Sequence, residues 1–337
     1  MTHSSQSPAL TFWRRLLRAL EEGHAVFLGL VVDHTRHSPG TRGARLFLAA
    51  DETRHGTLGG GVMESRILKR ATTRLKRRGP WATLETLVHR KTAPQSPNDS
   101  SASPSGMICA GEQTNLYYLC RPSEDRPAIA HLVDLLAEDR PSHLRISPSS
   151  LEVEESAPRF DLPTHRLEQE GEEWFYEEDL LERRRLAILG GGHCALALAR
   201  TMTNLGYVVT AFESQKKVPE EGLDTAVRHL EIVSRFQEAG HQIPYPEITQ
   251  VVVMTSDLQS DVAALIGTLG RPFPFLGVMG SPSKLAEIRC RLHREGFTHE
   301  DLDHLTAPVG LPIGSRTPEE IAISIAAQIL SLRQEAP

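Results

Sequence analysis

The stretch Leu186-Ala-Ile-Leu-Gly-Gly-Gly-His-Cys-Ala195 decides the fold of the second half of this chain. A short apolar run ends at Gly190 and a helical pattern begins at His193, so three glycines join a buried strand to a helix. Gly206 is a typical helix stop, and a second apolar run follows over residues 207–212. This order predicts a βαβ unit, in which a helix connects two parallel strands.

The glycine spacing in this unit matches the dinucleotide-binding fingerprint. Gly190-x-Gly192-x-x-Ala195 lies between strand and helix, and Glu213 ends the next strand roughly twenty positions later. Gly190 permits the turn, Gly192 admits a pyrophosphate at the helix N-terminus, and Glu213 can accept a hydrogen bond from a ribose hydroxyl. The alternative is a Rossmann-like fold whose nucleotide site is empty or altered.

The rest of the second half continues the alternation of strands and helices. Apolar runs at residues 250–254 and 273–279 enclose a helical pattern at residues 261–269, as expected for a parallel sheet. The last helix begins at Thr317-Pro-Glu-Glu320, where Thr317 and Glu320 form a capping box.

Two further segments follow strands at the carboxyl edge, where open α/β sheets collect ligands. Asp257 ends one of these strands and is either a ligand-binding residue or the cap of the next helix. Gly280 and Ser281 open another helix, with Lys284 in its first turn. Lys284 adds positive charge for an anion, although capping by Ser281 explains the segment without a ligand.

The first half is predicted to be mixed α and β. Helices are expected at residues 10–22, from residue 62 to residue 75, and at residues 128–138, where Pro127 suits a first turn; strands are expected at residues 25–33, 45–50, 81–88 and 115–120. A second glycine-rich loop, Thr57-Leu-Gly-Gly-Gly-Val-Met-Glu64, precedes the helix that begins near residue 62. Its glycines either cradle an anion or form a strained turn, and Glu64 is either an N-terminal cap or a functional group.

Cysteine usage leaves one thiol of interest in the first half. Cys109 lies between a Ser/Pro-rich segment and a strand, where a thiolate with a lowered pKa can bind a metal or a sulfur-bearing ligand. Burial as a packing residue is the alternative. Cys194 lies in the second glycine loop near a helix N-terminus, which lowers the pKa of a thiol, and helix packing explains this cysteine equally well. His193 is interpreted as a residue of the same loop.

Length and composition give the domain boundaries. A chain of 337 residues is long enough for two domains with their own cores. We expect an N-terminal domain over residues 1–150 with a Ser/Pro-rich loop at 92–106, a linker at 151–184, and a C-terminal Rossmann-like domain at 185–337. The fold class is therefore α/β.

The same composition argues against several partners. The chain has 37 Lys and Arg against 43 Asp and Glu, with no basic tail for nucleic acid. Its four cysteines have no metal-ligand or disulfide spacing, which favours a reducing compartment. Apolar runs are too short to span a bilayer and do not match a signal peptide. We expect a cytoplasmic protein.

Both halves contain a set of short motifs. In the front half these are His37-Ser-Pro-Gly40, Gly59-Gly-Gly61 with Glu64, and Cys109-Ala-Gly111. In the back half they are Ile188-Leu-Gly-Gly-Gly-His193, Val252-Val-Met-Thr-Ser-Asp257, Gly277-Val-Met-Gly-Ser281, Pro308-Val-Gly-Leu-Pro-Ile-Gly314 and Arg316-Thr-Pro-Glu-Glu-Ile321. Together these motifs resemble the XdhC/CoxI family of accessory proteins for molybdenum hydroxylases. The chain departs from the family pattern at Val62, Ala110 and Ser256, where the family usually has Cys, Gly and His.

The resemblance implies a chaperone that turns over no metabolite of its own. It implies binding of a molybdopterin-type cofactor, with or without a nucleotide, its sulfuration by a cysteine desulfurase, and its insertion into a xanthine dehydrogenase-type hydroxylase. A homodimer is implied too. The predicted cofactor-binding residues are Ser38, Gly40, Gly59, Gly60, Gly61, Glu64, Cys109, Gly190, Gly192, Glu213, Asp257, Gly280, Ser281 and Lys284, with Cys109 as the contact to molybdenum or its sulfur ligand.

Two other functions fit parts of the sequence. The βαβ fingerprint and Glu213 also suit an NAD(P)-dependent oxidoreductase, for which the sequence offers no recognisable hydride-transfer or proton-relay set. A scaffold that recruits the hydroxylase through protein contacts alone is the third interpretation.

Overall fold

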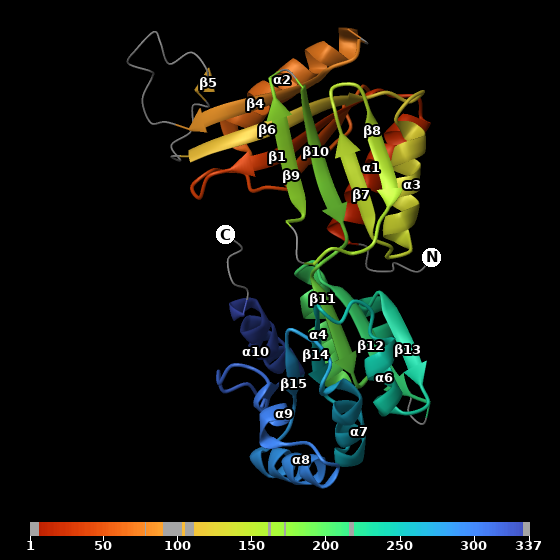
Figure 1. The fold of residues 1–337 in the computed structure, drawn as a ribbon, viewed down its shortest axis with the longest axis vertical. Helices are drawn as coiled ribbons and strands as arrows, with labels where there is room; N and C mark the ends of the chain where they lie inside the picture. Colours follow the sequence, from red (N-terminus) through yellow and green to blue (C-terminus); the bar gives the residue numbers. More distant parts are fainter. Residues whose placement is uncertain are drawn as a thin grey trace. The chain divides into compact units, whose positions relative to one another are not determined.

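The computed structural model describes residues 7–77, 79–89, 103–104, 111–160, 163–171, 173–215 and 219–332. The chain forms two compact units, an N-terminal unit over Pro8–Leu181 and a C-terminal unit over Glu182–Pro337 (Figure 1). Of the loop expected at residues 92–106, only residues 103–104 are described. Cys109 lies outside the described residues. Among the described residues, no helix is long and apolar enough to cross a membrane.

The C-terminal unit contains the predicted parallel sheet. Its strands are β11 (Arg185–Leu189), β12 (Val208–Ser214), β13 (His229–Val233), β14 (Thr249–Val253), β15 (Leu276–Val278) and β16 (Leu305–Thr306). They lie in the order β13-β12-β11-β14-β15-β16, and all neighbours are parallel. The order reverses between β11 and β14, which is where doubly wound sheets bind ligands at their carboxyl edge.

Helices cover both faces of this sheet. They are α4 (His193–Asn204), α5 (Leu223–Ala226), α6 (Phe236–Gln242), α7 (Leu258–Thr268), α8 (Pro282–Arg294), α9 (His299–Asp303) and α10 (Pro318–Ser331). Because side chains alternate along a strand, Leu186 and Ile188 join an apolar cluster with α4 and α10, whereas Ala187 and Leu189 join one with α6, α7 and α8. The predicted capping box of Thr317 and Glu320 is present at the start of α10.

The larger of the two sheets in the N-terminal unit has helices on both faces. Its strands are β1 (Val26–His34), β2 (Arg45–Ala49), β3 (Arg54–Gly56), β4 (Ala82–His89), β5 (Ser103–Pro104) and β6 (Gly111–Cys120), in the order β3-β2-β1-β6-β4-β5. The helices are α1 (Pro8–Glu21), α2 (Gly61–Arg77) and α3 (Arg126–Ala137). Val26 and Leu28 of β1 pack in a cluster with α1 and α3, which lie side by side, and Phe27 packs with α2 (Figure 1).

A second sheet in this unit replaces the linker that composition suggested. The strands β7 (Ser142–Ile146), β8 (Leu151–Glu155), β9 (His165–Glu170) and β10 (Glu173–Leu180) form an antiparallel sheet in the order β8-β7-β10-β9. The N-terminal unit therefore extends to Leu181, past the boundary expected at residue 150. Trp174, Tyr176 and Leu180 alternate toward the core of this unit, so β10 follows the period of a half-buried strand despite its acidic residues.

A buried ion pair joins the two sheets of the N-terminal unit. The Arg45 guanidinium of β2 lies 2.6 Å from the Glu178 carboxylate of β10, whose side chain is 2% exposed. Glu178 also accepts a hydrogen bond from the Tyr176 hydroxyl. A buried carboxylate requires such partners, so these contacts fix the position of β10 on the larger sheet.

Candidate functional site

The three glycines after β11 have different environments, which separates a position where the turn requires glycine from one with open space beside it. Gly190 has φ +125°, and a Cβ there would lie 2.4 Å from the Met254 carbonyl oxygen, so the turn itself requires glycine. A Cβ at Gly192 would meet no atom within 4 Å. Gly192 is the N-cap of α4, so its exposed side leaves open space beside free backbone N–H groups at a helix start. An anionic ligand can approach there.

Glu213, which the sequence predicts as a ribose-binding residue, lies against this loop. Its carboxylate accepts hydrogen bonds from the Gly191 N–H at 2.8 Å and the Ser214 N–H at 2.7 Å, and the residue is 5% exposed. A Cβ at Gly191 would lie 3.0 Å from the carboxylate. A carboxylate has about four lone-pair sites, so the two N–H donors leave acceptor capacity for a hydroxyl group.

Three strand ends lie level with one another at the carboxyl edge. Leu189 pairs with Val253, and Val253 pairs with Val278, in parallel register. Gly191, Thr255 and Gly280 each follow this row by two residues, just after the ends of β11, β14 and β15. The predicted residues of the C-terminal unit therefore gather at the edge where the strand order reverses.

Asp257 and Ser281 cap helices in the structure. The Asp257 carboxylate accepts hydrogen bonds from the backbone N–H and the hydroxyl of Ser260, at 2.8 and 2.9 Å. Ser281 accepts one from the Lys284 N–H at 3.3 Å. The capping interpretation is thus confirmed for both residues, and their cofactor-binding role stays a prediction.

Asp261 is a residue that the sequence analysis missed. Its side chain is fully buried, and it accepts hydrogen bonds from the Thr255 N–H at 3.1 Å and the Thr255 hydroxyl at 2.6 Å. It also forms an ion pair with Lys284, whose side chain is 26% exposed. Burial raises the pKa of the Asp261 carboxyl above its ordinary value, although hydrogen bonds from Lys284 and Thr255 act in the opposite direction.

The glycine loop of the N-terminal unit is held by Glu64. Its carboxylate accepts hydrogen bonds from the Thr57 hydroxyl at 2.6 Å, the Leu58 N–H at 2.9 Å and the Gly60 N–H at 3.1 Å. All three glycines, Gly59, Gly60 and Gly61, have positive φ. Glu64 therefore anchors its own loop from the first turn of α2, and both the strained turn and the capping role are confirmed.

Gly59 and Gly60 differ in the same way as the glycines of the other loop. A Cβ at Gly59 would lie 2.8 Å from the Gly40 nitrogen, so close contact with the loop at Gly40 requires glycine. A Cβ at Gly60 would meet no atom within 4 Å. Gly60 is therefore the position in this loop with open space beside it.

Gln113 joins these two loops and was not predicted. Its side-chain oxygen accepts hydrogen bonds from the Gly40 N–H and the Ser38 hydroxyl, both at 3.0 Å. Its amide nitrogen donates to the Leu58 carbonyl at 2.9 Å and to Asn115 at 2.7 Å. Ser38, Gly40 and the glycine loop thus lie together in the structure. The sequence signal that could have identified Gln113 is a polar residue at a position of a strand that faces the core.

The start of β6 closes against the same loop. A Cβ at Gly111 would lie 2.8 Å from the Ser38 nitrogen and 3.0 Å from the Thr35 hydroxyl oxygen. Thr35 is also bonded to Glu112, whose N–H donates to its hydroxyl at 2.7 Å. Gly111 of the predicted Cys109-Ala-Gly111 motif therefore belongs to this cluster, whereas the role of Cys109 stays a prediction.

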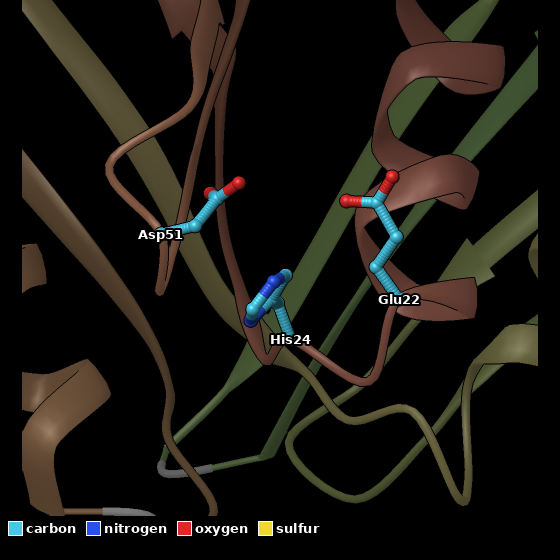
Figure 2. Close-up of side chains that lie close together, drawn as sticks. All are labelled: Glu22, His24 and Asp51. Atoms are coloured by element: carbon cyan, nitrogen blue, oxygen red, sulfur yellow. The ribbon is translucent and has the colours of Figure 1, made fainter.

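A separate cluster of potential metal ligands lies at one end of α1. Glu22, His24 and Asp51 offer ligand atoms within 4.8 Å of one another, and Figure 2 shows the His24 ring between the two acidic side chains. Glu22 is engaged by Arg18 at 3.0 Å, and both oxygens of Asp51 accept hydrogen bonds from Thr53. These contacts account for the positions of the two carboxylates, and we assign no metal to the cluster.

The fold and the edge residues define the class of the C-terminal unit. It is a Rossmann domain, and the family model described as the XdhC Rossmann domain matches residues 186–329. A second model, described as the XdhC and CoxI family, matches residues 19–87. The chain belongs to the XdhC and CoxI family and carries both of its domains, as the motifs predicted.

Two curated relatives each match about half of the chain. The uncharacterized protein YqeB of Escherichia coli K12 is 30% identical over 158 residues, which are 46% of this chain and 28% of YqeB. A probable xanthine dehydrogenase subunit of Bacillus subtilis is 27% identical over 183 residues, 52% of this chain and 48% of the relative. The chain thus spans less than half the length of either relative.

The solved structure shows the fold along nearly the whole chain. It is described as a xanthine dehydrogenase from Bacillus halodurans, shares 20% sequence identity, and gives a TM-score of 0.67. The alignment covers 96% of this chain and 97% of that chain.

Proposed function

We propose that this protein binds the molybdenum cofactor and inserts it into a xanthine dehydrogenase-type hydroxylase. Family membership through both domains is the observation that carries the proposal. A relative named as a probable xanthine dehydrogenase subunit supports the choice of partner. In this proposal the protein holds and transfers the cofactor and turns over no metabolite itself.

The residues present fit an anionic, phosphate-bearing cofactor. Gly60 and Gly192 both have open space where a Cβ would stand, at the starts of α2 and α4. Backbone N–H groups at a helix start bind phosphate well when they lack partners, because the helix dipole favours negative charge. This argument applies to α4, because at α2 the Gly60 N–H is already bonded to the Glu64 carboxylate. When bound, the cofactor would supply redox-active molybdenum with its terminal sulfur ligand.

Cys109 is the proposed contact to molybdenum or its sulfur. A thiolate is a soft ligand and suits both atoms. Three further parts of the proposal come from the family resemblance. They are a cysteine desulfurase that installs the sulfur, a homodimeric state, and a cytoplasmic location.

Retention of the cofactor tests the proposal directly. The anaerobically purified protein is titrated with molybdenum cofactor and passed through gel filtration, and the retained molybdenum and pterin are measured. We expect stoichiometric retention by the wild type and loss in Cys109→Ala. Cys290→Ala is the matched control, because this cysteine is exposed on α8 and should not affect retention. A wild type that retains no cofactor would contradict the proposal.

An NAD(P)-dependent oxidoreductase is the second candidate. The contact of Glu213 with Gly191 and the strand order of the C-terminal unit favour it. Saturable NAD binding with measurable reduction of a small substrate, beside no cofactor retention, would support this function instead. If the protein pulls down the hydroxylase with undiminished affinity in the absence of cofactor, and binds no cofactor itself, the scaffold function would be supported.

A further inference from the structure

Lys284 occupies a position that is electrostatically unfavourable by itself. It lies in the first turn of α8, after the N-cap Ser281, where the helix dipole favours anions over cations. Its side chain reaches inward to the buried carboxylate of Asp261 instead of outward to water. The opposite charge of Asp261 compensates for the dipole and holds the ammonium at the edge of the sheet.

The strand end beneath Lys284 leaves room for this conformation. A Cβ at Gly280 would lie 3.2 Å from Cδ of Lys284 and 3.1 Å from Leu285. Such contacts are tighter than ordinary van der Waals distances, so the glycine lets the stem of Lys284 cross the end of β15.

Asp261 is in turn fixed to the glycine loop. Thr255 donates two hydrogen bonds to Asp261, and its backbone nitrogen would lie 3.0 Å from a Cβ at Gly190. Two hydrogen bonds and an ion pair therefore link Thr255, Asp261 and Lys284, and Gly190 packs closely beside Thr255. Desolvating a carboxylate is costly, so a fully buried Asp261 must be held by these partners.

Lys284 and Glu213 lie on opposite sides of the glycine loop. Glu213 is on β12, next to β11, whereas the ammonium of Lys284 reaches from the start of α8 to Asp261, which is bonded to Thr255 just after β14, the strand on the other side of β11. Neighbouring strands are about 4.8 Å apart, so the ends of β12 and β14 are separated by about 10 Å. A nucleoside diphosphate on the glycine loop, with its ribose at Glu213, leaves the edge near Lys284 for a second half of the ligand.

We infer that Lys284 recognises the second, anionic half of a dinucleotide and that Asp261 is the residue that positions it. This inference rests on the proposed function, and it specifies the dinucleotide form of the cofactor as the ligand of the C-terminal unit. The part of the pair that reaches the surface belongs to Lys284, because the Asp261 side chain is fully buried and the Lys284 side chain is 26% exposed. An ammonium favours an anionic molybdopterin half and disfavours the positively charged nicotinamide ring of NAD⁺.

Isothermal titration with two pairs of probes tests the inference on the full-length protein. CDP and molybdopterin cytosine dinucleotide share a nucleotide half and differ in the second half, as do ADP and NAD⁺. The variants are Lys284→Met, Lys284→Arg, Asp261→Asn and the double variant Asp261→Asn/Lys284→Met. Arg289→Met is the control, because Arg289 is an exposed cation on the same helix.

We expect a loss confined to the second half of the ligand. Lys284→Met removes a charge-assisted hydrogen bond to the second half of the ligand. The affinity for the molybdopterin dinucleotide should therefore fall about tenfold or more, and the affinity for CDP less than about twofold. Asp261→Asn should have a similar selective effect, and the double variant should lose little more than either single variant. Lys284→Arg should keep much of the affinity, and the preference for ADP over NAD⁺ should decrease in Lys284→Met.

The outcomes separate this inference from the proposed function. If the affinities of Lys284→Met for CDP and for the dinucleotide fall equally, or neither falls, Lys284 does not contact the second half of the ligand. Should Lys284→Met fail to fold because Asp261 is left unpaired, the double variant removes that buried charge and decides the same question. A wild type that binds neither CDP nor the dinucleotide overturns the inference, whereas retention of a nucleotide-free cofactor that depends on Cys109 would still support the proposed function.

Discussion

The Glu213 carboxylate accepts a hydrogen bond from the Gly191 N–H at 2.8 Å, so the acidic residue and the glycine loop are already in contact without a ligand. A second bond from the Ser214 N–H at 2.7 Å fixes the orientation of the carboxylate. The group that would bind a ribose is therefore preorganised, and little conformational entropy is lost when a ligand binds.

Glu213→Gln should reduce discrimination between ribose and deoxyribose. The wild type should bind CDP about tenfold more tightly than 2′-deoxy-CDP, because a hydrogen bond to a charged acceptor contributes about 1.5 kcal/mol or more. In Glu213→Gln the ratio should fall to about twofold. Glu220→Gln is the control, since this nearby carboxylate binds His193 at 2.9 Å instead of the loop N–H groups. An unchanged ratio in Glu213→Gln would show that the carboxylate does not contact the 2′-hydroxyl.

Alanine at Gly59 and at Gly60 should have different effects. Gly59 has φ +118°, and an added Cβ would lie 2.8 Å from the Gly40 nitrogen, so Gly59→Ala should destabilise the N-terminal unit by about 2 kcal/mol or more. Gly60 has φ +72° and open space, so Gly60→Ala should cost only about 1 kcal/mol, from the left-handed backbone. Urea unfolding measures both. Gly60→Ala should still weaken cofactor retention, because the new methyl group occupies the open space; equal destabilisation of the two variants would contradict the assignment.

The sequence predicted the elements that local chemistry determines. The turn at Gly190, the capping box at Thr317 and the strained loop at Gly59 each depend on residues close together in the chain. Glu178 shows why β10 was missed. A glutamate is stable in the core only with a partner, and its partner Arg45 is far away in the sequence, on a strand of the other sheet. Asp261 was missed for the same reason, since its partner Lys284 lies one helix and one strand further along the chain.

Gln113→Leu should destabilise the N-terminal unit and separate its two loops. Leucine fills similar volume but leaves the Gly40 N–H and the Leu58 carbonyl without their partner, in a position where Gln113 is fully buried. Each unsatisfied buried group costs about 1–3 kcal/mol, so the free energy of unfolding should fall by about 2 kcal/mol or more. Urea unfolding tests this, with Gln169→Leu as the control because Gln169 lies outside this network. Equal stabilities for the two variants would show that the loops are held by other contacts.

Asp261→Asn should remove a pH dependence from the stability of the C-terminal unit. Burial raises the pKa of the Asp261 carboxyl above its ordinary value of 3.8. The folded protein then keeps a proton that the unfolded chain has released, so the contribution of this group is complete below pH 3.8 and is lost as the pH rises through the folded pKa. Asparagine does not titrate and still accepts from Thr255. Relative to the wild type, Asp261→Asn should therefore gain stability as the pH rises from about 4, until the folded pKa is passed and the difference becomes constant. Urea unfolding of both proteins at several pH values measures this difference, and a difference independent of pH would contradict a raised pKa for Asp261. Lys284→Met should show a loss that is larger and extends to higher pH than in the wild type, because without the ion pair the folded pKa of Asp261 rises further.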